Sequence, residues 1–139
     1  MPKSGPIIIV EDDHDDQDLL REVFEELKIP NLLRFFTSCM EALNYLLTTI
    51  ENPFLIISDI NLPTMNGFDF KNSINQNEFL RKKNIPFIFL STNAEKTAIH
   101  KAFDVLAQGY FIKPVKLIDI KEMILKIVDY WKMSGRAID

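Results

Sequence analysis

Several features that direct a fold or a location are scarce in this chain. Its 139 residues contain a single cysteine, Cys39, which excludes an internal disulfide and a cysteine-based zinc cluster. We interpret that cysteine as a small core residue at a helix start rather than as a nucleophile. No apolar run approaches the ~20 residues that a membrane-spanning helix needs, and the opening residues MPKSGP lack the apolar stretch of a signal peptide. These absences predict a cytoplasmic protein with no membrane partner.

Positive charge is also in deficit. Lys and Arg together number 16 against 20 Asp and Glu, and the resulting net charge of −4 argues against nucleic acid as a direct partner. The two histidines, His14 and His100, fall on predicted helices with no paired Cys or His nearby, which favours surface positions over metal ligation. The hydrophobic content of 47% suits a globular domain with a real core. With no repeat or linker, we expect one domain over residues 1–139, its core spanning about 6–132 between short tails.

Apolar runs alternate with helical patterns along the chain. Strands are predicted near residues 6–10, 32–36, 54–59, 86–91 and 109–112. Between them, apolar residues recur at the spacing of one helix face, in the stripes Leu20–Leu27, Leu43–Ile50 and Leu117–Trp131. This repeated alternation of strand and helix predicts a parallel sheet covered by helices on both faces.

Local signals predict where some helices begin and end. Ser38 with Glu41 in the next turn forms a capping box for the second helix, and Asn93 is expected to cap the fourth. Residues 72–85 are polar and rich in Asn and Lys, so the third helix is expected to fray there into a long surface loop before Pro86. The sequence leaves the role of this segment open.

Acidic residues close two of the predicted buried strands. Glu11, Asp12 and Asp13 follow the apolar run 7–10 at once, and Asp59 closes the run 54–57 after Ser58. Each group taken alone is better explained by loop positions, by helix caps or by the favourable dipole of a helix start than by a ligand site. Because ligand sites in open parallel sheets lie at the carboxyl ends of the strands, the repetition favours one shared site. A hard divalent cation such as Mg²⁺ takes carboxylate oxygens and would make the crowding of acids tolerable.

Two further strand ends carry polar groups. Ser91 follows the apolar run 87–90, and Lys113 with Pro114 follows the strand 109–112. Over essentially its whole length this chain resembles the receiver domain of two-component response regulators. The residues that match, in order and approximate spacing, are Glu11-Asp12, Asp59, Ser91 and Lys113-Pro114. The resemblance implies an α/β fold of the flavodoxin-like (βα)5 type, a doubly wound five-stranded parallel sheet with strand order 2-1-3-4-5.

The same resemblance implies a magnesium-dependent phosphoacceptor. Asp59 would be the nucleophile that accepts the phosphoryl group. Mg²⁺ would be held by Glu11, Asp12 and Asp59 together with the backbone carbonyl of Asn61.

A switch is implied as well. Lys113 would pair with the phosphoryl oxygens, and Ser91 would donate a hydrogen bond to one of them, although Thr92 beside it leaves that assignment open. Tyr110 is the aromatic residue that would turn inward as Ser91 moves, and the peptide before Pro114 is expected to be cis. The shift would remodel the face formed by the fourth predicted helix, the fifth strand and the last helix, where a downstream protein, or a second copy of this chain as a homodimer, would dock.

The function implied is that of a single-domain signalling switch. It would take phosphate from a sensor histidine kinase or a phosphotransfer protein and would be no enzyme beyond its own phosphorylation and dephosphorylation. Two alternatives stay open: a phosphorylation-independent interaction module of the same fold, and an aspartate-nucleophile phosphatase. The phosphatase is disfavoured because Asn61 stands where such enzymes carry a second acid. The cognate kinase, the target and the phosphoryl lifetime are not determined by the sequence.

Overall fold

A computed structural model describes residues 2–135, so Met1 and residues 136–139 of the predicted domain lie outside the described part of the chain. Five parallel strands form one sheet in the order β2-β1-β3-β4-β5. They are β1 (Ile7–Val10), β2 (Leu33–Phe36), β3 (Leu55–Ser58), β4 (Phe87–Ser91) and β5 (Gly109–Ile112). The predicted flavodoxin-like fold is therefore confirmed.

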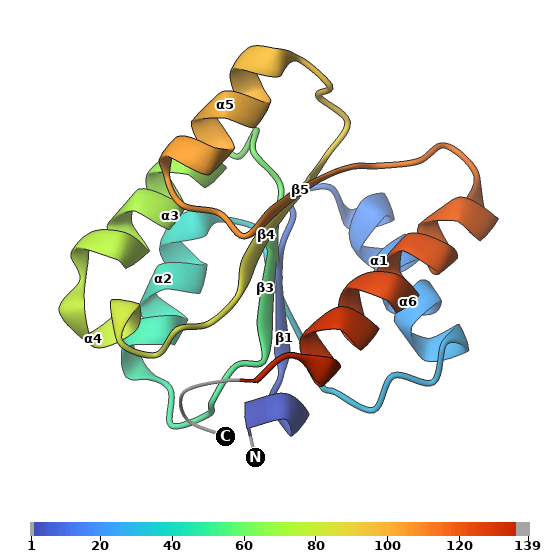
Figure 1. The fold of residues 1–139 in the computed structure, drawn as a ribbon, viewed down its shortest axis with the longest axis horizontal. Helices are drawn as coiled ribbons and strands as arrows, with labels where there is room; N and C mark the ends of the chain where they lie inside the picture. The colour runs from blue at the N-terminus through green and yellow to red at the C-terminus, as the bar shows by residue number, and fades with distance from the viewer. Residues whose placement is uncertain (1, 136–139) are drawn as a thin grey trace.

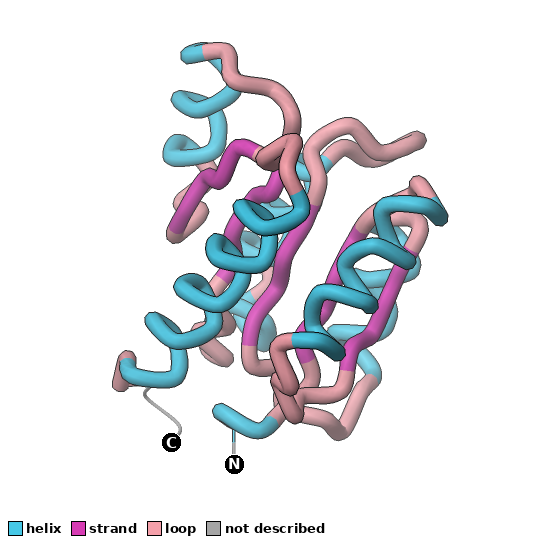
Figure 2. Tube along the Cα trace, turned by 90° about the vertical axis from the view of Figure 1, so that its right-hand side faces the viewer, coloured by secondary structure: helices cyan, strands magenta, loops and turns pink. Residues whose placement is uncertain are grey.

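Helices cover both faces of the sheet (Figure 1). They are α1 (His14–Glu26), α2 (Cys39–Thr48), α3 (Gly67–Gln76), α4 (Glu78–Arg81), α5 (Lys96–Asp104) and α6 (Leu117–Met133), after a short 3-10 turn, η1 (Pro2–Ser4). Buried residues of α1 and α6 pack on one face, and those of α2, α3, α4 and α5 pack on the other. In Figure 2 the strands accordingly lie as an inner layer between helices.

The central strands are apolar throughout because both of their faces are covered. In β1, Ile8 and Val10 point into the core beneath α2 and α3, whereas Ile7 and Ile9 point into the core beneath α1 and α6. All four side chains are at most 1% exposed. The continuous apolar runs bury both strands along their whole length, so the residues that end β1 and β3 lie together at one edge of the sheet.

Several predicted details are confirmed. Ser38 Oγ accepts a hydrogen bond from the Glu41 amide and caps α2. Cys39 is buried in the first turn of that helix, and burial raises the pKa of its thiol to about 12, as suits a core residue. Both His14 and His100 are exposed. No helix among residues 2–135 is both long and apolar enough to cross a bilayer.

Three predicted details are wrong. Asn93 does not cap a helix: α5 begins at Lys96, and Asn93 Oδ1 accepts the Glu95 amide in a turn just before it, a local bond that Asn favours. Residues 72–85 are no long loop, since α3 runs to Gln76 and the single turn α4 follows. No peptide bond among the described residues is cis, so the one before Pro114 takes the trans form that is intrinsically favoured.

The turn α4 exists because one apolar side chain in this polar stretch is anchored. Leu80 is 2% exposed in the core, and Asn77 Oδ1 accepts the Leu80 amide at the start of the turn. The fourth and fifth helices predicted from the sequence are therefore α5 and α6.

Candidate functional site

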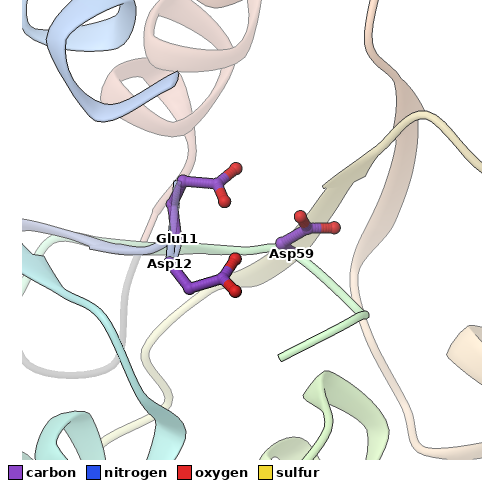
Figure 3. A group of neighbouring side chains, drawn as sticks. All are labelled: Glu11, Asp12 and Asp59. Atoms are coloured by element: carbon purple, nitrogen blue, oxygen red, sulfur yellow. The ribbon is translucent and has the colours of Figure 1, made fainter. Parts of the chain in front are cut away.

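Three carboxylates meet at the carboxyl edge of the sheet. Glu11 and Asp12 directly follow β1, and Asp59 directly follows β3, which pairs with β1 so that Val10 lies opposite Ser58. One carboxylate oxygen from each acid lies within 4.8 Å of the others. Figure 3 shows the Glu11 and Asp12 side chains extending from one strand end towards Asp59 on the next. The predicted convergence of these acids is confirmed.

Backbone donors hold two of the acids in place. Glu11 is 3% exposed, and its Oε2 accepts the amide of Asp13 at 3.1 Å. Asp59 is half-buried, and its Oδ1 accepts the amide of Ile60 at 2.7 Å. One oxygen of Asp59 is thus engaged by the backbone amide of the next residue.

Burial is the largest influence on the pKa values of the Glu11 and Asp59 carboxyl groups. Burial raises the pKa of Glu11, against the hydrogen bond from Asp13 and the nearby charge of Lys113. Burial likewise raises the pKa of Asp59, against the Ile60 amide and Lys113. A cation among these oxygens would favour their ionised forms, and carboxylates are the donors that hard divalent cations prefer, so the residues present fit Mg²⁺.

Lys113 reaches the acids from β5, two strands away from β3. Its Nζ lies 3.3 Å from Glu11 Oε1 and 3.4 Å from Asp16 Oδ2, and its side chain is 13% exposed. Its backbone amide donates to the Ser91 carbonyl, which fixes the loop after β5. Desolvation opposes the charge of Lys113, but Glu11, Asp16 and Asp59 outweigh it and raise the pKa of the ammonium.

The hydroxyl-bearing side of the site is connected to Tyr110. Ser91 is 2% exposed at the end of β4, and its Oγ accepts the Asn93 amide at 3.1 Å, whereas Thr92 is exposed. The half-buried Tyr110 donates its hydroxyl to the Asn93 carbonyl, and its ring lies near that of Phe89. Ser91 and Tyr110 are therefore joined through the backbone of one residue.

The loop after β3 is tightly packed against Asp59. Asn61 is exposed in this loop, and the Gly67 amide donates to the Ile60 carbonyl at 2.8 Å. A Cβ at position 67 would lie 2.3 Å from the Asp59 carbonyl oxygen and 2.8 Å from the Phe89 ring. Only glycine allows α3 to begin this close to the site.

Sequence reasoning missed two residues. Asp16 lies at the start of a helix, where an acid is explained by the helix dipole alone, yet it pairs with Lys113. Gln17 is buried, and its side-chain amide donates to the Glu11 carbonyl. No signal marks that role, because a glutamine in the first turn of a helix is ordinary. Asp13, by contrast, caps α1, and its carboxylate accepts the amides of Asp15 and Asp16.

The fold and the site define a class of protein. The domain is a doubly wound sheet that carries clustered carboxylates after β1 and β3 and a lysine after β5. It therefore belongs to the class of α/β domains with an acidic ligand site at the carboxyl edge of the sheet.

The chain belongs to the response regulator receiver domain family, whose model matches residues 7–125. Receiver domains are signalling modules of two-component systems rather than enzymes in the ordinary sense, and those of this kind take phosphoryl groups from sensor histidine kinases.

Two known regulatory proteins are similar to this chain over most of its length. The chain is 27% identical over 135 residues to Probable methanogenesis regulatory protein FilR2 of Methanothrix harundinacea, covering 94% of this chain and 86% of that protein. It is 28% identical over 130 residues to the response regulator Rcp1 of Synechocystis sp., covering 90% and 87%.

Two solved structures share the fold at comparable identity. The phosphorylated cyanobacterial phytochrome response regulator RcpA aligns with a TM-score of 0.84 at 26% identity, covering 95% of this chain and 96% of that one. The Mn²⁺-bound form of Rcp1 aligns with a TM-score of 0.81 at 26% identity, covering 95% and 97%.

Proposed function

We propose that this protein is a phosphorylation-dependent switch in which Asp59 accepts a phosphoryl group in a Mg²⁺-dependent reaction. The donor is a sensor histidine kinase or a phosphotransfer protein. The observation that carries the proposal is the meeting of Asp59 with Glu11, Asp12 and Lys113 at one edge of the sheet, from three separate strand ends. The phosphorylated relative RcpA and the Mn²⁺-bound relative Rcp1 support it.

Four groups would hold the Mg²⁺ ion. They are the carboxylates of Glu11, Asp12 and Asp59 and the backbone carbonyl of Asn61, an all-oxygen set that suits this ion. When bound, the ion supplies positive charge that offsets the repulsion between these acids and an incoming phosphoryl group.

The chemistry falls to Asp59. Its Oδ1 accepts the Ile60 amide, which leaves Oδ2 to attack phosphorus. A bond forms between this oxygen and phosphorus while the bond from phosphorus to the donor breaks, and the electron pair stays on the leaving group. Lys113 and Ser91 bind oxygens of the transferred group, so the protein contributes mainly positioning and charge.

The signal leaves the site through Asn93. Ser91 accepts the Asn93 amide and Tyr110 donates to the Asn93 carbonyl, so a Ser91 hydroxyl drawn towards the phosphoryl group disturbs both bonds. Tyr110 then moves inward and changes the face made by α5, β5 and α6. That face exposes Phe103, Ile112 and other apolar side chains, which suit a downstream protein or a second copy of this chain.

The proposal carries with it a cytoplasmic location and no direct contact with nucleic acid, in keeping with the single cysteine and the net charge of −4. Catalysis would be limited to the protein's own phosphorylation and dephosphorylation.

Intact mass spectrometry with Mg²⁺ and a small phosphodonor tests the proposal. One phosphoryl adduct per chain is expected, lost in Asp59→Asn and kept in the matched control Asp129→Asn, which removes an exposed acid on α6. Multiple turnover of phosphomonoesters would instead indicate a phosphatase. An adduct that never forms would leave the phosphorylation-independent interaction module.

A further inference from the structure

A second cavity lies away from the acidic site. It has a volume of about 290 Å³ and is bounded by the C-terminal half of α3, by α4 and by the residues that precede β4 and β5. The amino ends of these strands form the edge of the sheet opposite to Asp59. The volume lies just below the ~300 Å³ at which the usual range of small-molecule pockets begins, so the ligand must be small.

A buried ammonium group lines this cavity. Lys71 is 7% exposed, and its Nζ donates to Asn75 Oδ1 at 2.6 Å and lies 5.7 Å from the centre of the Phe87 ring. Within residues 2–135, no carboxylate forms an ion pair with it. Burial lowers the pKa of this lysine, with no opposing charge to raise it. Buried charges are normally paired, so this ammonium has capacity for an anionic partner.

The charged residues of the lining share one sign, and the rest of the lining combines apolar side chains with the amides of Asn75, Asn84 and Gln108. Arg81 from α4 contributes a second cation, and no acidic residue lines the cavity, although the chain as a whole carries a net charge of −4. The walls include the apolar side chains Ile74, Leu80, Ile85 and Leu106. A guanidinium and an ammonium beside apolar walls match an anionic head group on a small apolar body.

We propose that this cavity binds a small organic anion, a carboxylate or a phosphate-like group on an apolar body, with Lys71 and Arg81 as the cationic ligands. The cavity is held together across the chain, since Asn75 Nδ2 donates to the Val105 carbonyl and Gln108 Oε1 accepts the Phe87 amide. A bound anion therefore bridges α3 and α4 to the segment that leads into β5.

Nuclear magnetic resonance titration of ¹⁵N-labelled protein tests this site. Benzoate and phenylphosphonate serve as the two anionic probes and benzamide as the neutral probe of similar shape, all without Mg²⁺. At least one of the two anions is expected to shift the amide resonances of Ile74, Leu106 and Gln108, whereas benzamide is expected to leave them in place. Comparison of the two anions shows whether the site favours a carboxylate or a phosphate-like group.

Variants separate the site from general binding. Lys71→Met keeps most of the length of the side chain without its charge and is expected to weaken anion binding about tenfold or more, as the loss of a hydrogen bond from a charged donor predicts. Arg81→Gln is expected to weaken it in the same direction. Lys82→Met, at the exposed neighbour paired with Glu78, and Asp59→Asn, at the other edge of the sheet, are expected to leave binding unchanged.

Three results would overturn the proposal: no shift with either anion, equal shifts with benzamide, or equal affinity in Lys71→Met and the native protein. Any of them would leave Lys71 as a structural lysine satisfied by Asn75 and the Phe87 ring. Because Lys71→Met removes a desolvated charge, the variant is expected to stay folded, and its amide spectrum checks this directly.

Discussion

Lys113 divides its charge between two acids at this site. Its Nζ lies at similar distances from Glu11 and Asp16, and no ion pair with Asp59 is found in residues 2–135. A lysine that is to bind phosphoryl oxygens must leave at least part of this arrangement. The ion pair with Asp16 is therefore expected to compete with the binding of phosphoryl oxygens by Lys113.

Asp16→Asn is expected to speed formation of the Asp59 adduct from a small phosphodonor. A partly exposed ion pair contributes up to about 1 kcal/mol, so the rate should rise by about twofold to fivefold. Quenched samples measured by intact mass give the rate. Asp15→Asn, which removes the exposed acid next to it, is the control, and equal rates in the two variants would show that Asp16 does not restrain Lys113.

Gly67→Ala is expected to destabilise the protein by about 1–3 kcal/mol, the usual cost of overpacking. The added methyl would meet the Asp59 carbonyl oxygen at 2.3 Å, so the loop that positions Asp59 must shift. Urea unfolding measures the change. Gly135→Ala, where a Cβ would meet nothing within 4 Å, is the matched control, and similar stability of both variants would contradict the expectation.

The raised pKa of Asp59 makes a prediction for pH. A carboxyl group whose pKa is higher in the folded state binds more protons when folded, so its ionisation lowers stability as pH rises through that value. Without metal, Asp59→Asn is therefore expected to unfold at a higher temperature than the native protein at neutral pH. The gain should shrink as pH falls towards the ordinary aspartate pKa of 3.8. A gain that is constant with pH would assign the effect to packing, since the Ile60 amide can still donate to the asparagine oxygen.

At the scale of elements, α4 shows how much a single turn depends on its context. A helix of four residues, Glu78–Arg81, is too short to show a hydrophobic period, and it lies between polar residues rich in Asn and Lys. Its cap at Asn77 and its anchor at Leu80 act only because α3 and the sheet are already in place. The sequence of this turn is too short to be distinguished from the polar residues on either side of it.

Asn77→Ala is expected to lower the free energy of unfolding by about 1 kcal/mol, as the loss of a helix cap does. The cause is the Leu80 amide, which loses the side-chain oxygen that accepts its hydrogen bond. Chemical denaturation measures the effect. Asn72→Ala, at an exposed position inside α3, is the control, and a loss as large there would refer the effect to helix composition rather than to capping.

At the scale of the whole molecule, bound metal is expected to stabilise the fold. A ligand that binds only the folded state adds about 2.7 kcal/mol to the free energy of unfolding when its concentration is 100 times its dissociation constant. Added Mg²⁺ should therefore raise the melting temperature, and a chelator should reverse the rise. Asp12→Asn removes one of the three clustered carboxylates and should abolish it. A rise that persists in this variant would place the ion elsewhere.

The alternation of apolar runs and helical stripes was enough to predict a parallel sheet covered on both faces and the edge where Glu11, Asp12 and Asp59 meet, whereas the strand order came from the resemblance to receiver domains. This worked because a parallel sheet covered on both faces requires continuous apolar strands, and its loops collect at one end. The residues after each strand could therefore be assigned to the site from their place in the chain.

The partners of individual side chains were decided only by packing. Asp16 meets Lys113 across 97 residues of chain, and the Lys71 cavity forms where α3, α4 and the start of β5 come together. Neither has a local pattern, because each depends on how far one element lies from another after the crossovers close. Periodicity depends on which face of an element is buried, whereas contacts of this kind depend on distances that only the assembled sheet and helices set.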